Sequence, residues 1–301
     1  MRIVAALGGN ALLERGERPD SDIQLSHVQD AVAALAPLAL AHDLVVTHGN
    51  GPQVGMLALE SARDPALSRP FPFDVLGAQT QGMIGYWLAQ ALRGAVPGKA
   101  VGCLICQTLV NRDDPAFANP TKFVGPVYPE QQARALAVQQ GWTVRRDGAA
   151  WRRVVPSPEP RELVELPLIQ VLLDNGALVV CAGGGGIPVI ADESGALHGV
   201  EAVVDKDLTA AMLARAVHAD ALLLLTDVEA VIDGFGTADA RPVSRATPAE
   251  LRARLLPAGS MGAKVEAACR FAEATGRIAA IGRLDEAAAL LAGTAGTVVK
   301  P

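Results

Sequence analysis

Short apolar runs alternate along the chain with longer stretches that have helical spacing. The runs are mostly rich in Val, Ile or Leu and end at polar residues or glycine, a pattern typical of buried strands. The longer stretches are rich in alanine. Strands alternating with helices predict a mostly parallel sheet covered on both faces, which is an α/β fold. The predicted strands are residues 2–7, 43–47, 100–108, 177–182 and 221–226, and the predicted helices are residues 23–41, 208–217 and 261–275.

Residues 113–160 interrupt this alternation. The segment holds seven of the twenty prolines, two of the three tryptophans and Lys122. A stretch this long without a clear periodic pattern is usually functional. We therefore expect an inserted subdomain or lid outside the central sheet. Its four arginines, which we expect to form a solvated face rather than a phosphate site, are Arg145, Arg146, Arg152 and Arg153.

Composition narrows the class of protein. With 301 residues, the chain is long enough for two domains or two lobes of one large α/β unit. The net charge of −6 and the 4% aromatic content argue against a nucleic-acid surface, and the 50% hydrophobic content excludes general disorder. The first residues lack a signal-peptide pattern. The most apolar stretch, residues 166–190, is interrupted by Asp174, Asn175 and four glycines, so no membrane span is predicted and a cytoplasmic location is expected.

Cys103 and Cys106 form a CxxC pair, which is compatible with a redox pair or with half of a zinc site. Neither a second CxxC nor a nearby histidine completes a metal set. The pair also lies in an apolar run, so the sequence favours buried structural thiols.

Glycine-rich turns follow several predicted strands. Ligands of α/β proteins bind beyond the carboxyl ends of the strands, where glycine lets backbone N–H groups approach an anion. Glycine also often serves only to turn the chain, so one such turn decides little. The recurrence of glycine turns after several strands favours an anion-binding site. The turns are Gly8-Gly9-Asn10, Gly49-Asn50-Gly51, residues 183–186 and residues 259–262.

The common nucleotide-binding motifs are absent from the sequence. There is no GxxxxGK[ST] sequence, which excludes a P-loop enzyme. No GxGxxG follows the first strand, and residues 183–186 are followed by Ile187 and Pro188. A dinucleotide-binding dehydrogenase is therefore disfavoured.

Lysine is rare in this chain, with five residues against twenty-one arginines, yet three lysines lie beside distinctive motifs. Lys122 lies in a Pro-Thr-Lys-Phe-Val-Gly-Pro segment, Lys206 lies between two aspartates, and Lys264 follows the last glycine turn. Lysine offers a compact point charge that reaches a phosphoryl oxygen. Any one of them alone would be read as a solvated lysine.

Taken together, these segments resemble the carbamate kinases of the amino acid kinase superfamily, from end to end and in the same order. The segments that carry the resemblance are residues 6–12, 47–55, 120–126, 152–158, 182–188, 205–207 and 259–262.

The resemblance implies a three-layer αβα sandwich with a protruding subdomain at about residues 113–160. It also implies an N-terminal lobe, residues 1–195, for carbamate or carbamoyl phosphate, and a C-terminal lobe, residues 196–301, for ATP or ADP. Members of the family are homodimers that use Mg²⁺ with the nucleotide. Acetylglutamate kinases carry a lysine where this chain has Ala6, and the charge here would come from Lys122. The family usually has proline at the position of Ala263, which leaves the placement of Lys264 open.

Carbamate is already an anion, so it attacks phosphorus without a general base, and catalysis rests on positioning and charge. We expect Asp205 to orient Lys206 and a neighbouring lysine, and His48 to be structural rather than a substrate donor. Asp227 is expected near the ribose or base, although a strand-end aspartate also caps turns. The expected catalytic residues are Lys122, Lys206, Lys264 and Asp205. The expected substrate-binding residues are Gly8, Gly9, Asn10, Gly49, Asn50 and Gly51, with N–H donors among them. The expected nucleotide-binding residues are Asp227, Ser260, Met261, Gly262 and Lys264.

The predicted function is reversible phosphoryl transfer between ATP and carbamate, running toward ATP in arginine or purine breakdown. Alternatives are a related kinase with an acetylglutamate or uridylate acceptor, which Ala6 and Lys122 disfavour, and a non-catalytic nucleotide-binding regulator. The regulator is disfavoured because the three lysines and Asp205 are all present. We expect small-molecule partners and no nucleic-acid or membrane partner.

Overall fold

The computed structural model describes residues 1–14, 16–237, 239–254 and 260–301, without the side chains of Asn10 and Ser260. Its centre is an eight-stranded sheet in the order β15-β17-β16-β12-β1-β2-β9-β3. Every neighbouring pair is parallel except β16 and β17. These strands are β1 (Arg2–Leu7), β2 (Asp43–His48), β3 (Val101–Cys103), β9 (Leu178–Val180), β12 (Ala221–Thr226), β15 (Arg245–Ala246), β16 (Ile278–Arg283) and β17 (Thr297–Val299).

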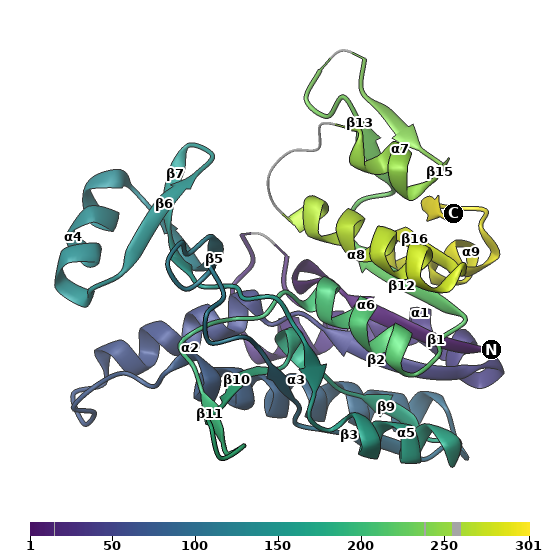
Figure 1. The fold of residues 1–301 in the computed structure, drawn as a ribbon, viewed down its shortest axis with the longest axis horizontal. Coiled ribbons are helices and arrows are strands. Elements are labelled where there is room, and N and C mark those ends of the chain that lie inside the picture. Colours follow the sequence, from purple (N-terminus) through teal and green to yellow (C-terminus); the bar gives the residue numbers. More distant parts are fainter. Residues whose placement is uncertain (15, 238, 255–259) are drawn as a thin grey trace.

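Helices cover both faces of this sheet, which confirms the three-layer αβα prediction (Figure 1). Alternate residues of β1 point to opposite faces: Val4 and Ala6 pack toward α5, α6 and α8, whereas Ile3, Ala5 and Leu7 pack toward α1, α3 and α9. The helices are α1 (Ser21–Ala41), α2 (Gly51–Arg63), α3 (Phe73–Ala95), α4 (Glu130–Gln140), α5 (Leu166–Asp174), α6 (Lys206–Ala216), α7 (Pro248–Arg252), α8 (Ser260–Thr275) and α9 (Ala287–Ala292), with 3-10 turns η1 (Gly9–Ala11), η2 (Gly183–Gly185) and η3 (Leu284–Glu286). Across the described ranges, none of the helices combines the length and the apolar character that a membrane crossing requires.

The predicted strand at residues 100–108 is wrong, because the chain there changes sheet. Cys106 donates its N–H group to Gln81 and accepts a hydrogen bond from the N–H group of Ile187, which turns the chain out of the large sheet. The segment therefore becomes β3 and a separate strand in a second sheet of order β11-β10-β4-β8. The strands of that sheet are β4 (Gln107–Leu109), β8 (Glu162–Leu163), β10 (Ile187–Ala191) and β11 (Leu197–Gly199).

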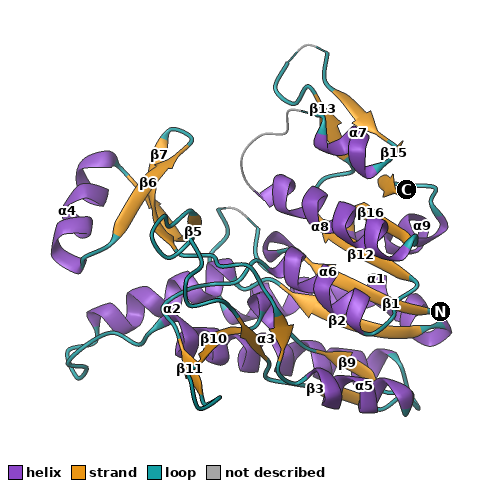
Figure 2. Cartoon of the chain, viewed as in Figure 1, coloured by secondary structure: helices purple, strands orange, loops and turns teal. Residues whose placement is uncertain are grey.

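The segment at residues 113–160 stands apart from the main body, as Figure 2 shows. It forms an antiparallel sheet of order β5-β7-β6 with α4 beside it. Its strands are β5 (Lys122–Tyr128), β6 (Thr143–Asp147) and β7 (Ala150–Val155), and a further small hairpin elsewhere consists of β13 (Val231–Asp233) and β14 (Arg241–Val243). The predicted protruding subdomain is present. The division into lobes at residue 195 stays a prediction.

Candidate active site

Three glycine turns meet at the carboxyl ends of neighbouring strands. The turn after β1 and the turn after β2 pack backbone against backbone: a Cβ atom added to Gly49 would lie 2.8 Å from the nitrogen of Gly9. The turn after β9 closes on the second turn, because a Cβ atom on Gly184 would overlap the side chain of Asn50. Positive φ angles, which residues with a side chain rarely adopt, are also found at Gly184, Gly185 and Gly186. Glycine here permits close approach of three chain segments.

The N–H groups of two predicted substrate residues are used within the fold. Gly8 donates its N–H group to the carbonyl of Leu225 at 2.9 Å, and Gly49 donates to the carbonyl of Leu7 at 2.9 Å. Both bonds extend the ladders of the parallel sheet past the strand ends. The expectation that Gly49 presents its N–H group to substrate is therefore wrong, and its part in the site is the close contact with Gly9.

The remaining predicted substrate residues lie at helix starts that face this meeting point. Gly9 and Asn10 form the first residues of η1, and Gly51 begins α2 with Pro52 in its first turn, as the sequence predicts. The start of the 13-residue helix α2 carries partial positive charge, which suits an anion, whereas the three-residue turn η1 is too short to add an appreciable dipole. Asn50 is held in place because its side-chain amide donates to the hydroxyl of Thr80 in α3 at 2.9 Å.

The three predicted lysines come together through two aspartates. Lys206 and Lys264 both contact Asp207, at 2.5 Å to one carboxylate oxygen and 3.2 Å to the other. Lys122 reaches across from the protruding subdomain to Asp205, with its Nζ atom 2.5 Å from Oδ2. The side chains of Lys206 and Lys264 are only 11% and 5% exposed, while Lys122 is 37% exposed. The arrangement is a mostly buried cationic cluster with one lysine at its open edge.

Asp207 is the residue that sequence reasoning missed. The sequence predicts that Asp205 orients Lys206, but the structure gives that contact to Asp207. The Oδ1 atom of Asp205 instead accepts the N–H groups of Asp207 and Leu208 at the start of α6, while its other oxygen receives Lys122. The physical reason is local: a helix-capping carboxylate turns back toward the first helical N–H groups. The signal available in the sequence is the second aspartate in Asp-Lys-Asp.

The charges of this cluster shift several pKa values. Burial lowers the pKa of Lys206, and the positive charge of Lys264 lowers it further. The pKa of Lys206 therefore falls to about 8, although the carboxylate of Asp207 opposes the shift. Burial alone would raise the pKa of Asp207, but Lys206 and Lys264 outweigh it and hold that pKa at about 2. Burial opposes the charge of Lys122, yet the carboxylate of Asp205 raises its pKa above the ordinary value. At neutral pH Asp207 is therefore ionised, and both Lys122 and most of Lys206 are protonated.

His48 lies beneath the turns and is fully enclosed. Its ring donates from Nδ1 to the carbonyl of Gly49 at 2.9 Å, taking the neutral tautomer, and packs against Gly183. Burial is the main cause that lowers its pKa to about 4, and nearby Lys206 adds to the effect. A neutral, hydrogen-bonded imidazole agrees with the structural role expected from the sequence.

On the predicted nucleotide side, α8 carries Met261, Gly262 and Lys264 near its start, and Asp227 lies exposed just beyond β12. The hydroxyl of Thr226 donates to Asp227 at 3.0 Å. The side chains of Asn10 and Ser260, together with Gly259, lie outside the described part of the chain.

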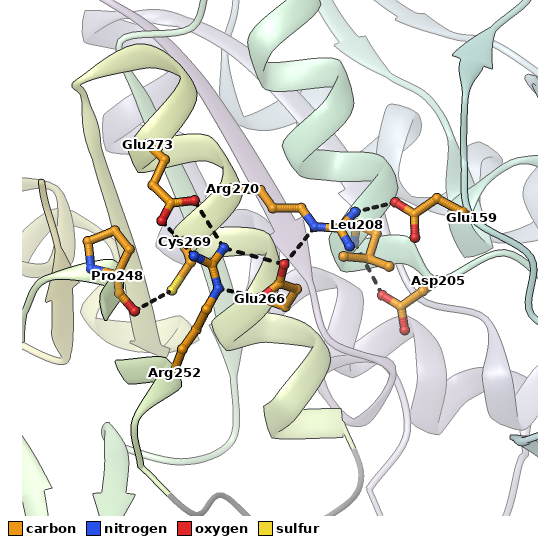
Figure 3. Close-up of polar contacts among 9 residues, drawn as sticks. All are labelled: Glu159, Asp205, Leu208, Pro248, Arg252, Glu266, Cys269, Arg270 and Glu273. Atoms are coloured by element: carbon orange, nitrogen blue, oxygen red, sulfur yellow. Dashed lines mark hydrogen bonds and ion pairs between the residues drawn. The ribbon is translucent and has the colours of Figure 1, made fainter. Parts of the chain in front are cut away.

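The helix α8 is anchored by charged side chains on its outer face (Figure 3). Arg252 of α7 contacts Glu266 and Glu273, and Arg270 contacts Glu266 at 2.8 Å. Arg270 also pairs with Glu159, which lies at the base of the protruding subdomain. The helix that carries Lys264 is thus tied to the segment that carries Lys122.

The expectation of a solvated arginine face holds for part of the cluster. Arg145 and Arg146 are exposed. Arg152 donates to the carbonyl of Gly125, and Arg153 lies over the aromatic rings of Phe73 and Trp142. For Arg152 and Arg153 the expectation is wrong, because Arg152 is held by contacts within the subdomain and Arg153 reaches Phe73 of the main body.

Comparison with known proteins places this geometry in a family. The sequence model of the Amino acid kinase family matches residues 1–293. A protein of Rhizobium meliloti named carbamate kinase is 51% identical, covering 99% of this chain and 93% of its own length. One of Escherichia coli K12 with the same name is 46% identical, covering 99% and 98%.

Solved structures agree with the sequence relatives. Carbamate kinase from Giardia lamblia bound to AMP-PNP superposes with a TM-score of 0.89 at 39% identity, covering 99% of this chain and 98% of that one. A protein of Aeropyrum pernix gives a TM-score of 0.91 at 41% identity, covering 100% and 99%. Likeness of sequence and fold over almost the full length leads to one conclusion: this chain belongs to the amino acid kinase family and, within it, to the carbamate kinases.

Proposed function

We propose that this chain catalyses reversible phosphoryl transfer between ATP and carbamate, giving ADP and carbamoyl phosphate. The observation that carries the proposal is the cluster of Lys122, Lys206 and Lys264, assembled on two aspartates beside three converging glycine turns. Two relatives named carbamate kinase, and a structure of that name bound to AMP-PNP, support the choice of acceptor and nucleotide.

The chemistry asks for charge and alignment rather than proton removal. A carbamate oxygen forms a bond to the γ-phosphorus while the bond to the β-phosphate oxygen of ADP breaks, and no proton has to leave the nucleophile. The proposed role of the lysines is to neutralise the equatorial oxygens of the moving phosphoryl group and the leaving phosphate. The helix starts at Gly9 and Gly51 would hold the carbamoyl end. His48 takes no part as a base because it is buried and its other ring nitrogen, Nε2, packs against Gly183.

The carboxylates near the lysines are poor candidates for metal ligands. Asp205 and Asp207 are both occupied by ammonium groups, and no group of three metal-ligating side chains occurs among the described residues. This donor set fits a Mg²⁺ ion carried by the phosphates of ATP or ADP rather than one held in a protein cage. When bound with the nucleotide, such an ion would supply positive charge to the phosphates, and the lysines of the chain would supply the rest.

We further propose that the reaction runs toward ATP in the cell, in arginine or purine breakdown. Carbamoyl phosphate is a mixed anhydride with a strong tendency to transfer its phosphoryl group, which favours ATP formation from ADP. The expected homodimer and cytoplasmic location stay predictions.

An assay of ADP plus carbamoyl phosphate, coupled to an ATP-consuming reporter, tests the function. Acetylglutamate and uridylate, each with ATP, are run beside it as competing acceptors. We expect ATP formation from carbamoyl phosphate and negligible ADP formation with the other two. Transfer to acetylglutamate or uridylate at a comparable rate would refute the proposed acceptor.

The role of Lys206 has its own test. Loss of one charge-stabilising donor typically costs about 3–4 kcal/mol of barrier. We expect Lys206→Ala to lower kcat by a corresponding 10²- to 10³-fold, with a much smaller change in ATP affinity measured by calorimetry. An unchanged kcat would refute the role assigned to this lysine.

A further inference from the structure

The protruding subdomain has to be held in one position if Lys122 is to reach the site. Lys122 begins β5, and its ammonium group spans to Asp205, 83 residues further along the chain. Besides this contact and the Arg270–Glu159 pair, the subdomain packs on the start of α3 and on α2 through a small apolar cluster separate from the two large cores. Its buried members are Val54, Ala58, Phe73, Leu76, Val124 and Val155.

Two glycines bring the subdomain against α2. A Cβ atom on Gly55 would overlap the backbone of Gly125, so the two chains touch with no side chain between them. Gly125 has a φ of +70° at an irregularity in the pairing of β5 with β7. This contact sets the separation between α2 and β5, but a backbone contact without side chains does not by itself fix the orientation of the strands.

Arg153 supplies an oriented contact. Its guanidinium carbon lies 4.7 Å from the ring centre of Phe73, in the main body, and 4.7 Å from the ring centre of Trp142, in the subdomain. The side chain is 18% exposed. A planar cation over aromatic faces is attracted by their electron density, and a lysine ammonium does not stack in the same way.

Glu201 connects this arginine to the main body. One carboxylate oxygen accepts the N–H group of Phe73 at 2.8 Å, at the start of α3. The other lies 3.5 Å from the guanidinium of Arg153. The carboxylate thus bridges the first residue of α3 and the subdomain, and it contacts the backbone of the same residue whose ring receives the arginine.

The strand register carries this fastening to Lys122. Arg153 lies on β7, where it pairs with Val124 of β5. Val155, two residues further along β7, pairs with Lys122. A shift of β7 against the main body would therefore move Lys122 with it.

We propose that Arg153 is a positioning residue, which with Glu201 fastens the subdomain to the start of α3 and so holds Lys122 at the phosphoryl-transfer site. The inference rests on the proposed function, because it gives Lys122 a part in the transfer. It adds a residue whose effect on the reaction passes entirely through Lys122.

A double-mutant cycle on kcat tests this coupling. Misplacement of a reacting group by about 1 Å can cost about 10²-fold in rate, so we expect Arg153→Met to lower kcat by about 10- to 100-fold. In a Lys122→Ala background the same change should lower kcat by less than about twofold, because coupled residues are not additive. The matched control is Arg146→Met, an exposed arginine on the neighbouring strand β6, which should leave kcat unchanged in both backgrounds.

Glu201→Gln provides a second route if Arg153→Met fails to fold. Its side chain is 53% exposed and the amide oxygen still accepts the N–H group of Phe73, so only the charge contact is lost. We expect a smaller fall in kcat that also disappears in the Lys122→Ala background. Equal losses in both backgrounds, or no loss with intact Lys122, would overturn the proposal.

Amide hydrogen exchange separates this inference from the proposed function. Loss of Arg153 should speed exchange in residues 122–128 and 150–155, relative to Arg146→Met, whether or not the protein turns over carbamoyl phosphate. Unchanged exchange in an active enzyme contradicts the fastening. Faster exchange in Arg153→Met, together with no ATP formation from carbamoyl phosphate by the unmodified protein, would support the fastening and refute the proposed function.

Discussion

Replacement of Asp207 by asparagine probes the electrostatic core of the site. Asp207 is buried, and its two oxygens hold Lys206 and Lys264. An asparagine side chain at this position would keep the shape and remove the charge that supports both ammonium groups. The pKa of Lys206 is already about 8, because burial lowers it and Lys264 adds repulsion that Asp207 only partly offsets.

The size of the effect follows from the contact. Two unit charges about 4 Å apart interact by about 4 kcal/mol at an effective dielectric constant near 20. At about 1.36 kcal/mol per unit, this corresponds to about 3 pKa units. Asp205 and entering water would offset part of the loss, so we expect the pKa of Lys206 to fall by about one to three units. Near pH 7.5 the protonated fraction would then drop from about three-quarters to a minor one.

The assay is the pH dependence of kcat/KM for ATP formation, which reports the free enzyme. In the unmodified protein the rate constant should fall as pH rises through about 8, where Lys206 loses its proton. In Asp207→Asn the fall should occur at lower pH, so that kcat/KM at pH 7 is reduced by about 2- to 100-fold, as the smaller protonated fraction of Lys206 requires. The matched control is Asp205→Asn, which keeps a helix-capping side chain and should move the fall less.

The folded state has to be checked alongside activity. Leaving buried charges without their partner typically costs about 3–5 kcal/mol of stability, so unfolding curves should define a temperature at which the variant is native. A fall in kcat/KM at the same pH as in the unmodified protein, measured on folded Asp207→Asn, would refute the reasoning.

Three further predictions concern the turns, the buried histidine and the chain's acid stability. Gly49→Ala should lower kcat/KM for carbamoyl phosphate by about 10- to 100-fold, because the added Cβ atom would press on Gly9. The control is Gly51→Ala, whose Cβ atom meets nothing within 4 Å and which should keep the kcat/KM of the unmodified protein. Equal effects of the two substitutions would contradict the packing argument. The pKa of His48 is about 4 in the folded protein against an ordinary 6.5, so the unfolded chain binds more protons between these values and stability is lost as pH falls from 6.5 toward 4. From pH 7 to pH 5 the loss of stability from this group is about 2 kcal/mol. Urea unfolding of His48→Asn should lack this loss. Asp207 has a folded pKa lowered to about 2, so its contribution is present above pH 4 and is lost as pH falls through 2, and unfolding of Asp207→Asn should be less acid-sensitive in that range.

The sequence is sufficient for elements whose pattern is local. The apolar runs at residues 2–7 and 221–226 coincide with β1 and β12, and Gly8 marks where β1 ends. The helix α3 is not predicted, because four glycines within it dilute its apolar face. The strand at residues 100–108 is misread because the partners that divide it, Gln81 and Ile187, are distant in the chain.

The candidate site likewise has features that the local sequence reveals and features that depend on distant contacts. The three lysines can be singled out because lysine is rare here, but the partners of Lys264 and Lys122 lie 57 and 83 positions away in the chain. In the sequence Asp207 is only a flank of Lys206, since burial of a carboxylate is a property of the folded chain. Arg153 looks like part of a charged surface, because a run of arginines usually is one. Its contact with Phe73 brings together separate segments.

The central claim is that the lysine cluster stabilises the phosphoryl group during its transfer. The most direct test is a structure of the protein with ADP, Mg²⁺ and aluminium fluoride, which mimics the transferring phosphoryl group. Our account predicts the ammonium groups of Lys122 and Lys206 within hydrogen-bond distance of the mimic or its bridging oxygens, with Asp207 still holding Lys206 and Lys264. A mimic bound beside the glycine turns with those ammonium groups turned away from it would contradict the account.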